Sequence, residues 1–112
     1  MTDWTFTEVD RRISKELSDF LPERIFDAHA HLYRLADLNS SAQFLNDRPG
    51  DVSIDTWRER LGRQLGEHRL QGALFIPFPT AGCAIEKVNE FTVSQVSVNM
   101  ESRGLIAVSP DM

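Results

Sequence analysis

The stretch GALFIPF, residues 72–78, constrains the fold more than any other feature, because it is a nearly continuous apolar run. Strands that are buried on both faces have this composition, and they belong to parallel sheets. Two shorter apolar runs, RIFDAHA at 24–30 and GLIAVS at 104–109, lie before and after it along the chain. Pro22 precedes the first run and Pro110 follows the last. The three runs therefore predict three short strands at the centre of the protein.

Helical periodicity fills the intervals between these runs. Residues 54–69 and 84–102 both carry apolar side chains at helical spacing. The first stripe comprises Ile54, Trp57, Leu61 and Leu65, and the second comprises Ile85, Val88, Val96 and Met100, with Phe91 at its border. Trp57 and Phe75 stand at core spacing, so we expect both in the interior. Strands that alternate with helices indicate an α/β fold with a parallel sheet and right-handed crossovers.

A further helix is predicted ahead of the first strand, over residues 5–21. The sequence TFTE at 5–8 fits a capping box in which Thr5 is the N-cap and Glu8 bonds back to it. Apolar side chains then recur every fourth residue, which predicts one buried face. These side chains are Val9, Ile13 and Leu17.

The composition excludes several function classes. The chain has 112 residues, enough for one small domain, and a net charge of −5, unlike the basic surface of a nucleic-acid-binding protein. No apolar run approaches the roughly 20 residues of a membrane helix, and the N-terminus has no apolar signal core. Cys83 is the only cysteine, so no internal disulfide can form. We therefore expect a cytoplasmic protein that binds neither nucleic acid nor membranes.

Two of the three histidines stand one residue apart in FDAHAHLYR, residues 26–34. Because side chains alternate along a strand, we expect one face to carry Ile25, Asp27, His29 and His31, and the other, packed under helices, to carry Phe26, Ala28, Ala30 and Leu32. Two imidazoles at such positions can bind one metal ion at about 2.0–2.1 Å from each nitrogen. The alternative interpretation is a pair of hydrogen-bonded histidines with a structural role.

The sequence RIFDAHAHLY resembles the first barrel strand of the amidohydrolase superfamily, an apolar strand that leads into Asp-x-His-x-His. More narrowly, the chain is similar to the amidohydrolase-2 family, which includes aminocarboxymuconate-semialdehyde decarboxylase-like proteins. VNEF at 88–91 and RGLIAVSP at 103–110 resemble the helix and strand that follow in that family. The resemblance covers residues 23–112 and implies the N-terminal βαβαβ part of a (β/α)₈ barrel, with residues 1–22 as a separate helical segment.

The resemblance also implies a divalent metal, commonly zinc, at the carboxyl ends of the barrel strands. His29 and His31 match the first two metal ligands, and Asp27 matches a supporting residue next to them. The implied activity is hydrolysis of a small molecule by metal-activated water. Non-oxidative decarboxylation, a lyase activity of the same family, is the alternative.

The chain departs from this family in its length. A complete barrel takes about 250 residues, and this chain supplies three strands of eight. The remaining metal ligands and the catalytic acid or base have no counterpart, so no catalytic residue is assigned. We therefore expect the N-terminal part of a longer enzyme, inactive alone. The hypothesis from another class is a non-catalytic α/β domain that forms a homo-oligomer.

Other candidate residues follow the histidine pair. Tyr33 and Arg34 begin a polar stretch, residues 33–53, whose length suggests a lid or binding loop. They either contact substrate, with Arg34 recognising a carboxylate, or lie exposed in that loop. We interpret Cys83 as a small buried hydrophobe rather than a nucleophile, because no histidine follows it in the chain. His68 is expected on a solvated helix face.

Overall fold

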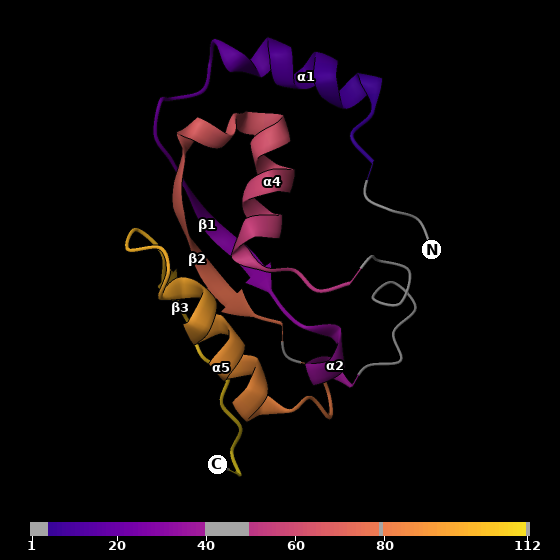
Figure 1. Ribbon diagram of the computed structural model, residues 1–112, viewed down its shortest axis with the longest axis vertical. Helices are drawn as coiled ribbons and strands as arrows, with labels where there is room; N and C mark the ends of the chain where they lie inside the picture. The colour runs from indigo at the N-terminus through magenta and orange to yellow at the C-terminus, as the bar shows by residue number, and fades with distance from the viewer. Residues whose placement is uncertain (1–4, 40–49, 79, 112) are drawn as a thin grey trace.

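The computed structural model describes residues 5–39, 50–78 and 80–111. Three parallel strands in the order β1-β2-β3 form its sheet, so the predicted α/β class is confirmed (Figure 1). The elements are α1 (Glu8–Ser18), β1 (Ile25–Leu32), α2 (Leu35–Leu38), α4 (Ile54–Leu65), a 3₁₀ turn (Glu67–Arg69), β2 (Leu70–Pro77), α5 (Ile85–Val96) and β3 (Arg103–Gly104). None of the helices in the described ranges is long and apolar enough to cross a membrane.

The main hydrophobic core lies between one face of the sheet and the helices α4 and α5. Trp57 of α4 packs edge-on against Phe75 of β2, with ring centroids 5.2 Å apart, and both side chains are buried as predicted. The other buried members are Ala30, Leu32, Ile54, Leu70 and Ala73, and α5 adds the partly buried Phe91 and Val96. Because α4 and α5 share this core, both cover the same face of the sheet.

The opening helix starts two residues later than predicted. Thr7, not Thr5, is the N-cap of α1, and Asp10 takes the role expected of Glu8. The Thr7 backbone N–H and hydroxyl both donate to Asp10 Oδ2 at 2.8 Å, and the Asp10 N–H donates to Thr7 Oγ1 at 3.2 Å. Asp10 satisfies two donors of Thr7 at once, which explains why the helix begins here.

The predicted buried face of the opening helix is wrong. Val9, Ile13 and Leu17 are 52%, 47% and 37% exposed, because α1 lies across α4 outside the main core (Figure 1). The Arg69 guanidinium holds the end of α1 by donating to the carbonyls of Ser18, Leu21 and Pro22, at 2.6 to 3.1 Å. Hydrogen bonds at the helix end therefore supplement its limited apolar burial.

The two later helices are shorter than the sequence pattern suggests. Gly66, with φ of 95°, ends α4 at Leu65, since this backbone conformation favours glycine. The predicted extension to residue 69 is instead the 3₁₀ turn. Helix α5 ends at Val96, so Met100 is 90% exposed and the prediction that it belongs to the inner stripe is wrong.

The third strand covers only Arg103–Gly104 rather than residues 104–109. The Leu105 N–H still donates to the Phe75 carbonyl at 2.9 Å. Beyond it the Asn89 side chain of α5 pairs with both backbone groups of Ala107, donating to its carbonyl at 2.9 Å and accepting from its N–H at 2.8 Å. Asn89 therefore supplies the partner that a neighbouring strand would otherwise provide.

The segment predicted as a long loop has regular structure at both of its ends. Tyr33 and Val52 form an antiparallel bridge with two backbone hydrogen bonds, at 3.0 and 2.8 Å. Helix α2 follows Tyr33, and the Leu35 N–H donates to the Asp51 carboxylate at 3.0 Å. Residues 40–49, the middle of the predicted lid or binding loop, are outside the described residues.

Candidate metal centre

His29 and His31 lie near the carboxyl end of β1, and their rings converge. The two Nε2 atoms are 3.1 Å apart, and the rings meet edge-to-face with centroids 4.9 Å apart. His29 is exposed and His31 is half-buried. The prediction that these two side chains share one face of the strand is confirmed.

The separation of the two nitrogens suits a shared metal ion. Two ligands about 2.0–2.1 Å from one zinc, at angles between about 90° and 110°, lie about 2.8–3.4 Å from each other. The 3.1 Å between the Nε2 atoms falls within that interval. The pair therefore has the geometry of a two-point metal clamp.

The Nδ1 atom of His31 lies 3.0 Å from the backbone carbonyl oxygen of Ile76 on β2. A carbonyl can only accept, so Nδ1 carries the proton and Nε2 of the neutral ring keeps its lone pair. The Nε2–H of His29 then donates to His31 Nε2, so one proton occupies the place between the rings that a metal would take. Phe78 packs edge-on against the His31 ring at 5.2 Å, which further fixes its orientation.

Asp27 supports this pair through the backbone and not through the imidazole rings. Its Oδ1 accepts from the His29 N–H at 3.1 Å, and its Oδ2 accepts from Trp57 Nε1 at 2.9 Å. Since Trp57 belongs to the core under α4, Asp27 faces the helices, on the same side as Ala30 and Leu32. The prediction that Asp27 shares the histidine face is therefore wrong.

Irregular pairing between β1 and β2 explains this change of face. The register shifts between Asp27 and Ala30, and again between Ile25 and Phe26, so strict alternation fails along β1. Ile25 packs against the core, whereas Phe26 is 50% exposed and Ala28 is exposed. The expectation that Phe26 and Ala28 pack under helices is wrong for the same reason.

The pair is incomplete as a catalytic metal centre. Within the described part of the chain, no group of three or more His, Cys, Asp or Glu side chains could hold a metal ion. Catalytic zinc sites use three protein ligands and one open position for water. The donor set of His29 and His31 therefore fits a divalent metal such as zinc, but only as part of a larger coordination sphere.

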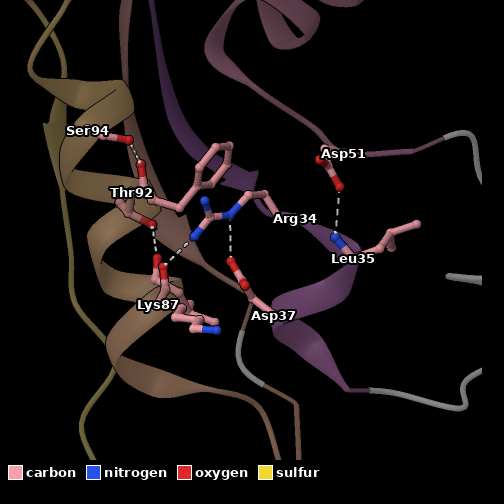
Figure 2. Close-up of polar contacts among 9 residues, drawn as sticks. Arg34, Leu35, Asp37, Asp51, Lys87, Thr92 and Ser94 are labelled. Atoms are coloured by element: carbon pink, nitrogen blue, oxygen red, sulfur yellow. Dashed lines mark hydrogen bonds and ion pairs between the residues drawn. The ribbon is translucent and has the colours of Figure 1, made fainter.

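Tyr33 and Arg34 both have internal contacts, which corrects the expectation of an exposed loop pair. Tyr33 is 8% exposed in a second core with Leu38 and Val88. Arg34 Nε donates to Asp37 Oδ2 at 2.6 Å, and Nη2 donates to the Lys87 carbonyl at 3.3 Å. Figure 2 shows Arg34 reaching from the start of α2 toward α5, between these two partners. Their role toward a substrate stays a prediction.

Two sequence candidates remain, Cys83 and His68. Cys83 is half-buried against the second core, which agrees with its interpretation as a small hydrophobe. His68 is exposed as expected, but it lies in the 3₁₀ turn before β2 and not on the helix. Neither the Ile76 carbonyl nor Trp57 could be identified from the sequence as a partner of the site, because both reach it through contacts between distant segments.

Comparisons with known protein families, with curated proteins and with solved structures found no match to this chain. The resemblance to the amidohydrolases therefore rests on the histidine motif and the order of the segments around it.

Proposed function

We propose that this chain supplies two ligands of a metal-dependent hydrolase of the amidohydrolase type. His29 and His31 bind a divalent metal, zinc, at the carboxyl end of the first strand of a (β/α)₈ barrel. The observation that carries the proposal is the 3.1 Å approach of the two Nε2 atoms, with His31 Nδ1 held by the Ile76 carbonyl. Ligands at the carboxyl ends of parallel strands are typical of such folds.

The exposure of His29 favours metal binding over a structural role. A structural histidine usually directs its ring nitrogens to fixed partners in the protein interior. Here His29 is exposed, and its Nε2 faces the equivalent atom of His31. Two metal-ligating atoms that meet at an accessible position constitute a clamp.

Each part of the chain near the clamp has a definite task under this proposal. The Ile76 carbonyl fixes the tautomer and orientation of His31, as partners of metal-ligating histidines commonly do. The Asp27 carboxylate holds the backbone of His29. A bound zinc supplies the water activation from which hydrolysis of a carbonyl substrate follows. At least one more ligand must come from outside the described residues.

Zinc affinity of the purified chain, measured by competition with a chromogenic chelator, tests the proposal. We expect His29→Ala and His31→Ala each to weaken zinc binding by about tenfold or more, since each removes one of two ligands. His68→Ala is the matched control, because it removes the third histidine at an exposed position away from the pair. Equal zinc affinity in all four proteins would contradict the proposal.

A further inference from the structure

The end of β2 supplies two contacts of the His31 ring. His29 and His31 share a face of the sheet with Leu74 and Ile76, away from the core under α4 and α5. His31 is paired with Ile76 in the strand register, and its Nδ1 lies 3.0 Å from the Ile76 carbonyl oxygen. Phe78, two residues further on, meets the same ring edge-to-face, with centroids 5.2 Å apart and an interplanar angle of 83°. One short segment therefore contacts His31 at two different points.

The hydrogen bond to Ile76 does not by itself fix the direction of the His31 ring. The χ2 torsion of histidine is broad, so a ring that is held at one atom can pivot about that atom. The Phe78 ring packs against it nearly at right angles, an arrangement that aromatic pairs about 4.5–7 Å apart prefer. The two contacts together fix the direction of Nε2, which lies 3.1 Å from the Nε2 of His29.

Phe78 is in turn held by the second core. Its ring centroid lies 5.7 Å from that of Tyr33, with the ring planes tilted by 42°, and Phe78 packs against the buried cluster to which Tyr33 belongs. Tyr33 itself is fixed by its antiparallel bridge with Val52. A series of aromatic contacts therefore leads from the second core through Phe78 to the ring of His31.

The chain after β2 is also tied to α2 and its C-cap by three hydrogen bonds. These run from the Thr80 hydroxyl to the Leu38 carbonyl, from the Asn39 side-chain amide to the Gly82 carbonyl at 3.2 Å, and from the Ala84 N–H to the Asp37 carbonyl at 2.8 Å. Since Thr80 lies two residues after Phe78, this junction limits where the Phe78 ring can lie. The orientation of His31 therefore depends on contacts that lie outside β1.

We propose that Phe78 is a positioning residue of the metal clamp, which directs Nε2 of His31 toward the metal. The inference rests on the proposed metal-binding role of the pair and adds a residue that acts through His31. Without the Phe78 ring, His31 keeps the Ile76 hydrogen bond alone, and its ring samples orientations in which Nε2 turns away from His29. Zinc affinity then falls, because binding must first restore the orientation that Phe78 provides in advance.

Zinc affinity and the tautomer of His31, measured in three Phe78 variants, test this role. We expect Phe78→Ala to weaken zinc binding by about tenfold, as loss of a partner that orients a ligand commonly does. In imidazole ¹⁵N NMR of the metal-free chain at alkaline pH, His31 should be the Nδ1–H tautomer, and Phe78→Ala should give a mixture of both tautomers. Phe78→Tyr keeps an aromatic ring and should restore most of the zinc affinity. Phe78→Leu keeps much of the apolar volume and should change both readouts in the direction of Phe78→Ala, so the test does not depend on the folding of the alanine variant.

Val88→Ala is the matched control, because it removes packing from the same second core, where Val88 is 4% exposed, and leaves the Phe78 ring in place. It should leave zinc affinity and the His31 tautomer unchanged, and an equal change in both readouts would overturn the inference. Unchanged zinc affinity and an unchanged tautomer in Phe78→Ala would overturn it as well and leave the proposed function intact. No zinc binding by the unaltered chain would overturn the proposed function and, with it, the role of Phe78 toward the metal.

Discussion

The convergence of His29 and His31 follows from their spacing in the sequence. The residues that hold the two side chains in place could not be predicted from that spacing. Two residues apart on a strand, His29 and His31 were predictable as a pair, and the structure brings their Nε2 atoms to 3.1 Å. The Ile76 carbonyl lies 45 positions along the chain from His31, and the Trp57 indole lies 30 positions from Asp27. Only the strand register and the helix packing bring them to the site. Asp27 was identified as a supporting residue, but its face was not, because the register shift is invisible in the sequence.

At this residue scale, Asp27→Ala should affect both metal affinity and stability. The substitution frees the His29 N–H and the Trp57 Nε1–H. Zinc affinity should fall about tenfold, as loss of an outer partner typically causes, and the free energy of unfolding should fall by about 1–3 kcal/mol. Trp57→Phe is the matched control, since it removes the second hydrogen bond and part of the indole packing but keeps the bond from Asp27 to the His29 N–H. It should lower stability with unchanged zinc affinity, and equal affinity losses in both variants would contradict the assigned role of Asp27.

The capping box of α1 makes a separate prediction about pH. Hydrogen bonds from the Thr7 backbone and then its hydroxyl lower the pKa of Asp10 below its ordinary value of 3.8. A lowered folded-state pKa means that the stabilisation is present above 3.8 and is lost as the pH falls through the folded value. The Thr7 amide proton resonance should therefore move as Asp10 is protonated. In Asp10→Asn this transition should be absent, and its persistence there would contradict the assignment.

At the scale of elements, the sequence predicted which segments form helices and strands better than where they end. The apolar run at 72–78 and the periodic stripe at 54–65 correspond to β2 and α4. The ends depended on single local features. These are the hydrogen bond from Thr7 to Asp10, the positive φ of Gly66, and the hydrogen bonds between the Asn89 side chain and the backbone of Ala107. Residues 105–109 do not continue β3, because the Asn89 side chain bonds the backbone groups of Ala107 that a neighbouring strand would otherwise bond.

The close approach of β2 to the turn before β3 gives a prediction at this scale. A Cβ at Gly72 would lie 2.8 Å from the Glu101 carbonyl carbon and 3.0 Å from the Ser102 nitrogen, both backbone atoms. Gly72→Ala should therefore lower the free energy of unfolding by about 1–3 kcal/mol in urea denaturation. At Gly104 the nearest atoms are methyl groups of Val96 and Thr92 at 3.2 and 3.3 Å. Gly104→Ala should cost less, and the reverse order would contradict this packing.

At the scale of the whole molecule, the helices cover one face of the sheet and leave the other to the histidine pair. The sequence predicted the alternation of strands and helices and hence the parallel sheet, which the strand order confirms. It could not show which side chains of β1 face the helices, because two register shifts move them. The apolar face and the two-ligand clamp on one surface are therefore structural findings, and the hydrolase proposal rests on that clamp.

Imidazole nitrogen NMR of the ¹⁵N-labelled chain tests the metal clamp most directly. On addition of zinc, we expect the Nε2 resonances of His29 and His31 to move to metal-bound positions. The Nδ1 of His31 should stay protonated on the Ile76 carbonyl, and His68 should not change. Resonances of His29 and His31 that do not respond to zinc, or that respond only together with His68, would contradict the clamp.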